Sequence, residues 1–134
     1  MDQGPLVREE IDAGGELTRE FDKYAPVMVA FWLKASDDEY RYLFIASDQI
    51  NDTNFDLAYR EVLRLTSKMN SLYLDPFRVK VIGADDPLAK AAVDIHQRFP
   101  GIFPTRFGGK MFGGISVDDV YIYESSLSAP VPSN

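Results

Sequence analysis

The segment Val27-Met28-Val29-Ala30-Phe31-Trp32-Leu33 is the longest apolar run in the chain, and the expected architecture follows from it. In an extended strand, successive side chains point to opposite faces of the sheet. Because every position of this run is aliphatic or aromatic, a strand over residues 27–34 would be apolar on both faces. Such strands are typical of the centre of a sheet that is covered from both sides. The segment therefore predicts a layered domain with a buried central strand.

The residues that follow predict an antiparallel hairpin and then a crossover. A polar turn at residues 35–39 leads to a second strand over 40–47. A loop rich in Asp and Asn leads to a helix over 55–69, which Asp52, Thr53 or Asn54 would cap and Asn70 would end. A third strand over 77–82 alternates apolar and basic residues, a pattern typical of a half-buried strand near a sheet edge. The helix is long enough to connect parallel strands.

The chain begins with an amphipathic segment over residues 5–24 that contains Gly14 and Gly15. Either one helix continues through the glycine pair, or two short helices meet there. We favour one helix, because the apolar residues keep their helical phase across the pair. In that case Gly14 would let the helix approach the sheet closely. The shared apolar face consists of Leu6, Ala13, Leu17, Phe21 and Tyr24.

A third helix and a glycine-rich region complete the expected fold. Asp85 or Asp86 would cap a helix that has Pro87 at its first position. Its buried face would consist of Leu88, Ala92, Ile95 and Phe99. Farther on, the segments 115–117 and 120–124 would form a closing hairpin around the turn Asp118-Asp119, with room for one more strand in the glycine region.

These elements predict one α+β domain over residues 1–124, in the order α-β-β-α-β-α-β-β. A central mixed sheet of about five strands would carry the helices. The last ten residues, 125–134, are rich in Ser and Pro, and we expect them to be a disordered tail.

Composition excludes several classes of function. The 134 residues carry a formal net charge of −7, and they contain no cysteine and a single histidine, His96. Thiolate chemistry and sites built on two imidazoles are therefore excluded, and we expect no cofactor and no metal site. The acidic balance and the scattered basic residues disfavour nucleic-acid binding. Since no apolar run has the length of a membrane span and residues 1–5 do not resemble a secretory signal, we expect a cytoplasmic protein.

The most unusual stretch is Thr105-Arg106-Phe107-Gly108-Gly109-Lys110-Met111-Phe112-Gly113-Gly114. Its glycine amides, together with the charges of Arg106 and Lys110, could cradle an anion, with Gly108 and Gly109 at the centre. The spacing matches neither dinucleotide-binding nor P-loop motifs. The alternative is a bulged or bent hairpin whose Phe107, Met111 and Phe112 side chains fill the core.

Two aromatic pairs are candidates for an interface. Tyr40 and Tyr42 share one face of the second strand, and Tyr121 and Tyr123 share one face of the last. If helices leave either face uncovered, these residues would form a contact surface, because Tyr is enriched among binding hot spots. The alternative is ordinary core packing.

The remaining polar groups have simple structural explanations. His96 stands near the end of the third helix, where it would bond a carbonyl or favour the negative helix end. The pairs Asp37-Asp38, Asp85-Asp86 and Asp118-Asp119 lack the spacing of a cation-binding loop. We therefore assign no catalytic residue.

The sequence supports two hypotheses about function. The first is a non-enzymatic protein-interaction or regulatory module that binds a protein partner or forms a homodimer. The alternative is a domain that binds a small anionic molecule, or a modest enzyme, using the glycine segment 105–114.

Overall fold

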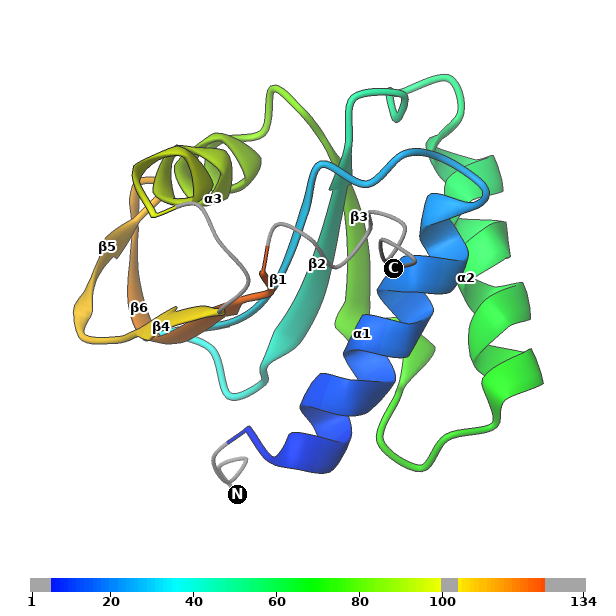
Figure 1. Ribbon diagram of the computed structural model, residues 1–134, viewed down its shortest axis with the longest axis horizontal. Helices are drawn as coiled ribbons and strands as arrows, with labels where there is room; N and C mark the ends of the chain where they lie inside the picture. The colour runs from blue at the N-terminus through cyan, green and yellow to red at the C-terminus, as the bar shows by residue number, and fades with distance from the viewer. Residues whose placement is uncertain (1–5, 100–103, 125–134) are drawn as a thin grey trace, which may run out of the picture.

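The computed structural model describes residues 6–99 and 104–124, and it confirms an α+β fold built on a mixed sheet (Figure 1). The sheet has six strands in the order β3-β2-β1-β6-β4, and β5 also pairs with β6. The elements are α1 (Arg8–Asp22), β1 (Val29–Ala35), β2 (Tyr42–Ser47), α2 (Phe55–Met69), a 3-10 turn (Pro76–Arg78), β3 (Val79–Gly83), α3 (Pro87–Arg98), β4 (Thr105–Phe107), β5 (Lys110–Phe112) and β6 (Ile115–Ile122). The predicted tail, 125–134, lies outside the described residues.

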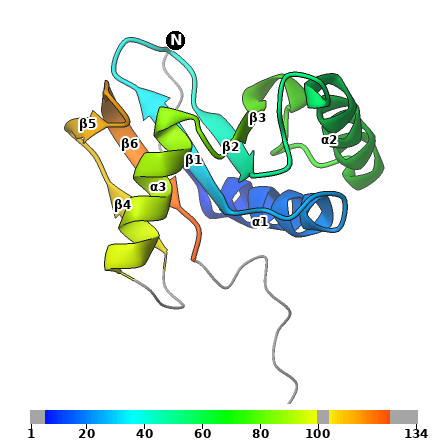
Figure 2. The ribbon, with the colours of Figure 1, turned by 90° about the horizontal axis from the view of Figure 1, so that it is seen from above.

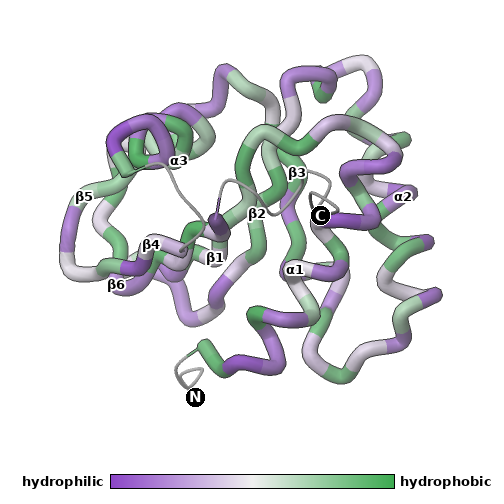
Figure 3. The backbone as a smooth tube through the Cα atoms, viewed as in Figure 1, coloured by the Kyte–Doolittle hydropathy of each residue, from purple (hydrophilic) through white to green (hydrophobic). Residues whose placement is uncertain are grey.

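The prediction of a central strand covered on both faces is confirmed for β1. Ala30 and Trp32 pack into a core with α1 and α2, whereas Phe31 and Leu33 pack into a second core with α3. All of these side chains are buried. Figures 1 and 2 show the resulting layers, with α1 and α2 together on one side of the sheet and α3 on the other. Hydrophobic residues accordingly concentrate along β1 and β2 (Figure 3).

The glycine pair near the N-terminus does not interrupt the helix, so the single-helix prediction is confirmed. A Cβ atom added to Gly14 would lie 2.6 Å from Tyr123 Oη and 2.9 Å from Trp32 Nε1. At Gly14, therefore, α1 packs closely against Trp32 and Tyr123, and a side chain there would have no room. The helix ends at Asp22, and Tyr24, beyond it, is exposed instead of sharing the buried face.

The predicted hairpin and crossover are also present. Strands β1 and β2 pair antiparallel, and β2 pairs with β3 in parallel. Helix α2 has the predicted bounds and ends at Asn70, whose φ of 49° is left-handed. Asn54 is the N-cap residue of this helix, but its side-chain oxygen accepts a hydrogen bond from Asn51 N instead.

Strand β3 is an edge strand, as its basic residues predicted. It starts two residues later than expected, because Pro76–Arg78 form a 3-10 turn that the Asp75 side chain caps. Phe77 is consequently exposed instead of sharing the buried face of Val79 and Val81.

Helix α3 begins as predicted, with Pro87 first and the Asp86 side chain accepting a hydrogen bond from Leu88 N. The prediction that Phe99 belongs to the buried face is wrong. The helix ends at Arg98, so Phe99 leaves the helical phase and is 66% exposed. The fully buried residues of α3 are Ala89 and Ala92.

The predicted closing hairpin around Asp118-Asp119 is also wrong, because β6 runs without a break from Ile115 to Ile122. The chain reverses instead at Gly113 and Gly114, whose φ values of 58° and 89° suit a two-residue hairpin turn. Asp118 and Asp119 lie at an irregularity in the pairing with β1, where the register shifts between Lys34 and Ala35. Aspartate pairs are typical of turns, but this pair lies at an irregular point within a strand.

None of the helices in the described part of the chain combines the length and the apolar composition that crossing a lipid bilayer requires.

Candidate functional site

Helix α3 leaves the starts of β2 and β3 uncovered, and we call this part of the sheet the open half-sheet. Farther along β2, Phe44 and Ala46 are buried in the core that includes α3. Helix α3 packs against β1, away from β3 (Figures 1 and 2). On the open half, Tyr42 is half-buried, Tyr40 is 38% exposed and Lys80 is exposed. Tyr42 shares the face of Phe44 because the two are two residues apart on β2, and Lys80 shares it because it pairs with Phe44 across the strands. Tyr40 precedes β2.

Two cations lie on the rings of the two tyrosines. The guanidinium carbon of Arg78 is 3.5 Å from the ring centroid of Tyr40, and Lys80 Nζ is 4.4 Å from that of Tyr42. These distances are within the range of cation–π attraction. We call Tyr40, Tyr42, Arg78 and Lys80 the tyrosine–cation surface. Over residues 6–99 and 104–124, no carboxylate pairs with either cation.

A depression of about 290 Å³ adjoins this surface, between the start of α1 and the loop that precedes β3. Both of its carboxylates bond backbone amides. Glu10 Oε1 accepts from Val7 N at 3.3 Å, and Asp75 Oδ1 accepts from Phe77 N at 2.9 Å. The lining residues are Glu10, Trp32, Tyr40, Arg41, Leu72, Tyr73, Asp75 and Arg78.

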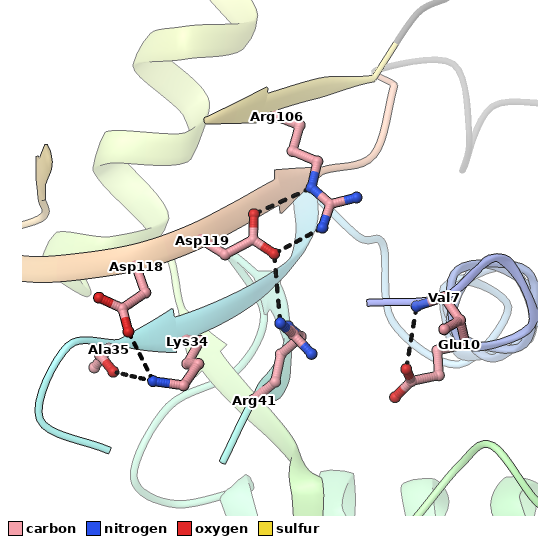
Figure 4. A network of polar contacts seen from close by, with 8 residues as sticks. All are labelled: Val7, Glu10, Lys34, Ala35, Arg41, Arg106, Asp118 and Asp119. Carbon is pink, nitrogen blue, oxygen red and sulfur yellow. Dashed lines mark hydrogen bonds and ion pairs between the residues drawn. The ribbon is translucent and has the colours of Figure 1, made fainter. Parts of the chain in front are cut away.

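A network of charged residues runs along the neighbouring end of the sheet (Figure 4). Asp119 accepts two hydrogen bonds from Arg106, at 3.1 and 2.9 Å, and lies 3.5 Å from Arg41 Nη2. Bonding to Asp119 raises the pKa of Arg106. Hydrogen bonds from Lys34 and Ser36 lower the pKa of Asp118. The network therefore ties β1, β4 and β6 together through charge-assisted bonds.

The proposed anion cradle is not assembled as the sequence suggested. Arg106 pairs with Tyr121 across the sheet, and Lys110 pairs with Val117. Cross-strand partners share a face. Since Tyr121 packs on the α1 side and Val117 on the α3 side, Arg106 and Lys110 point to opposite faces.

The glycines of this segment have a structural role. Gly108 and Gly109 lie between β4 and β5, beside Asp118 and Asp119 of β6. A Cβ atom added to Gly108 would lie 2.1 Å from the carbonyl oxygen of Asp118, so the backbones meet closely there. Gly109, with a φ of +67°, bonds the Val117 carbonyl. The bent hairpin buries Phe112, half-buries Phe107 and leaves Met111 exposed.

The second tyrosine pair packs within the domain. Tyr121 is half-buried, and Tyr123 is only 4% exposed. The Tyr123 hydroxyl accepts a hydrogen bond from Trp32 Nε1 at 3.0 Å and donates one to the Ile11 carbonyl. Burial raises the pKa of Tyr123 well above its ordinary value. The four tyrosines therefore lie on two different faces, and only Tyr40 and Tyr42 share the open half-sheet.

His96 lies in the last turn of α3, with Nε2 2.7 Å from the Tyr123 carbonyl oxygen. This is the kind of carbonyl contact that its helix-terminal position predicted, but the partner belongs to the strand end and not to the helix.

The acidic pairs remain apart from one another. Within the part of the chain that the structure describes, no three His, Cys, Asp or Glu side chains gather as metal ligands would. A crevice of about 390 Å³ does lie at the carboxyl ends of β2 and β3, where Asp48, Asp52 and Asp85 are among the lining residues. Ligand sites of open α/β sheets often occupy this place. The sequence offered only the oxygen-rich loop as a signal for it.

Arg78 and Lys80 of the tyrosine–cation surface, and Leu72 and Tyr73 of the adjoining depression, were not predicted from the sequence. The signal that could have found the two cations is their spacing. Arg78 stands two residues before Lys80 and Tyr40 two residues before Tyr42, at the starts of the neighbouring strands β3 and β2.

Comparisons of this chain with protein-family models, curated proteins and solved structures gave no match.

Proposed function

We propose that this chain is a non-enzymatic protein-interaction module and that its contact surface is the tyrosine–cation surface with the adjoining Leu72 and Tyr73. The residue types support this proposal, since Tyr and Arg are enriched among residues that dominate binding energy. Exposed apolar side chains around them supply area that a partner can bury, with Leu72 97% exposed and Tyr73 45% exposed.

The observation that carries the proposal is the stack of Arg78 on Tyr40. The two groups are 3.5 Å apart on an uncovered half-sheet, so each restricts the other before any partner arrives. A surface that is already ordered loses less conformational entropy on binding than a flexible one. The alternative, an anion site at the glycine segment, gains no comparable support, because Arg106 is held by Asp119 and Lys110 faces the other way.

Site-specific crosslinking tests the proposal. A photoreactive phenylalanine analogue would replace Tyr40 in one variant and Leu63, an exposed residue of α2, in a matched control. Sedimentation of the purified chain first shows whether it self-associates. We expect position 40 to crosslink a discrete protein, or a second copy of the chain, that position 63 does not.

Binding of the purified crosslinked protein completes the test. We expect Tyr40→Ala to weaken its affinity about tenfold or more, as for a hot-spot residue, and Leu63→Ala to leave it unchanged. Identical crosslinks from both positions would refute the proposal. So would a partner whose affinity is the same for Tyr40→Ala and the parent chain, or a monomer that gives no crosslink at position 40.

A further inference from the structure

The depression beside the tyrosine–cation surface combines an apolar rim with Arg78, whose N–H groups form no ion pair among the described residues. Leu72 and Tyr73 form the exposed rim, and Arg78 lies on the side shared with Tyr40. Trp32 also lines the depression although its side chain is buried.

The charges around the depression leave Arg78 able to bind an anion. Its own carboxylate neighbours, Glu10 and Asp75, each accept a backbone N–H, and neither forms an ion pair with Arg78 among the described residues. Lys80, farther along β3, adds a second cation without a carboxylate partner in the same part of the chain. The surface therefore carries positive charge on a chain whose net charge is −7.

Stacking determines which part of Arg78 stays accessible. The guanidinium presents its flat face to Tyr40, with its carbon 3.5 Å from the ring centroid. Its N–H donors lie in the plane of the group and point outward from its edge. A guanidinium that is held in this way presents a fixed fork, which matches the two oxygens of a carboxylate.

We infer that the partner is an acidic protein segment, in which a carboxylate binds the edge of Arg78 and a neighbouring apolar side chain packs on Leu72 and Tyr73. This inference rests on the proposed function, and it adds the chemistry of the partner. A nucleic acid fits less well, because its affinity depends on neutralising many phosphates and this surface offers only two such cations.

The test uses labelled ten-residue peptides and fluorescence anisotropy at physiological salt. One peptide alternates Leu with Glu, and two controls replace Glu with Gln or Lys. We expect the Glu peptide to bind best and to change the emission of Trp32, the single tryptophan of the chain. Equal affinity for the Glu and Gln peptides would overturn the inference.

Matched variants assign the binding to Arg78. Arg78→Gln should weaken the Glu peptide about tenfold, the effect of losing one charge-assisted pair. Arg78→Lys should restore only part of that affinity, because an ammonium keeps the charge without the planar fork. Lys90→Gln removes one charge from an exposed position on α3 and should change nothing. An equal loss in Lys90→Gln and Arg78→Gln would reduce the effect to net charge and overturn the inference.

Two further outcomes separate this inference from the proposed function. If the protein crosslinked at position 40 binds the chain but neither the Glu peptide nor Arg78→Gln affects that complex, the acidic partner is wrong and the interaction surface stands. If a single-stranded oligonucleotide binds more tightly than the Glu peptide and loses affinity in Arg78→Gln, the surface binds nucleic acid and both conclusions fall.

Discussion

Replacing Gly14 with alanine tests how closely α1 packs on the sheet. The added methyl group would lie 2.6 Å from Tyr123 Oη and 2.9 Å from Trp32 Nε1. These two atoms bond each other at 3.0 Å, and the Tyr123 hydroxyl also donates to the Ile11 carbonyl. The methyl group can fit only if the tyrosine or the helix moves.

The expected cost follows from three opposing contributions. Alanine is more favourable than glycine inside a helix by about 1 kcal/mol. Weakening the two hydrogen bonds of the Tyr123 hydroxyl costs about 1 kcal/mol each. Forcing extra volume into a packed core costs about 1–3 kcal/mol. Gly14→Ala should therefore lower the free energy of unfolding by about 2–4 kcal/mol, although alanine is the better helix former.

Urea unfolding measures this change by far-UV circular dichroism and by the fluorescence of Trp32. Glu16→Ala, at an exposed position of the same helix, is the control and should alter the free energy of unfolding by less than about 0.5 kcal/mol. Removing the hydroxyl with Tyr123→Phe should make room for the methyl group, so Gly14→Ala should cost about 1–2 kcal/mol less in that background. A Gly14→Ala chain as stable as the parent would refute the close contact between α1 and the sheet.

Three other substitutions probe the strand contacts and the buried hydroxyl. Gly108→Ala should lower the melting temperature more than Gly109→Asn, because its methyl group would meet the Asp118 carbonyl oxygen at 2.1 Å whereas position 109 has open space and a φ that Asn tolerates. Asp119→Asn should lower the free energy of unfolding in urea by about 1–2 kcal/mol, since two guanidiniums lose the carboxylate that they share. The folded-state pKa of the Tyr123 hydroxyl lies above its unfolded value near 10, so its stabilisation is complete below about pH 10 and is lost as pH rises toward the folded pKa. Tyr123→Phe should therefore flatten the loss of stability above about pH 10. Parallel pH slopes for Tyr123→Phe and the parent chain would contradict that assignment.

The sequence predicted the layers of this fold because burial determined its most regular patterns. The run around Trp32 is apolar at successive positions, and only a central strand can bury both of its faces. The bounds of α2 could be predicted because Asn70 ends the helix in a left-handed conformation that favours Asn. At Gly14 the helical phase of the apolar residues was a better guide than the low helix propensity of glycine.

Local composition misled where long-range pairing decided the structure. Asp118 and Asp119 have the composition of a turn, yet β6 continues through them and pairs with β1 and β4 on either side. Lys34, Arg41 and Arg106 bond their carboxylates. Lys34 is 84 residues from Asp118 and Arg41 is 78 residues from Asp119, separations at which no local sequence pattern carries information.

The candidate site was predicted only in part, for a related reason. The alternation of residues predicted Tyr40 and Tyr42 as neighbours on one strand face, but it could not show which of the two tyrosine pairs would remain uncovered. That depends on where α3 sits. Its fully buried residues are the small side chains Ala89 and Ala92, and it packs mainly over β1.

The position of α3 also affects how a partner can bind to the open half-sheet. Strand β3 is an edge, and an exposed edge invites a partner to add a strand. Two features oppose that mode here: β3 has only five residues, and it follows a 3-10 turn whose Pro76 carries no backbone N–H. Lys80 on this strand further discourages pairing with another edge. A partner is therefore expected to contact side chains on the face of the sheet, where Arg78 and Lys80 are already held against tyrosine rings, and substitutions there should alter affinity more than substitutions along the edge.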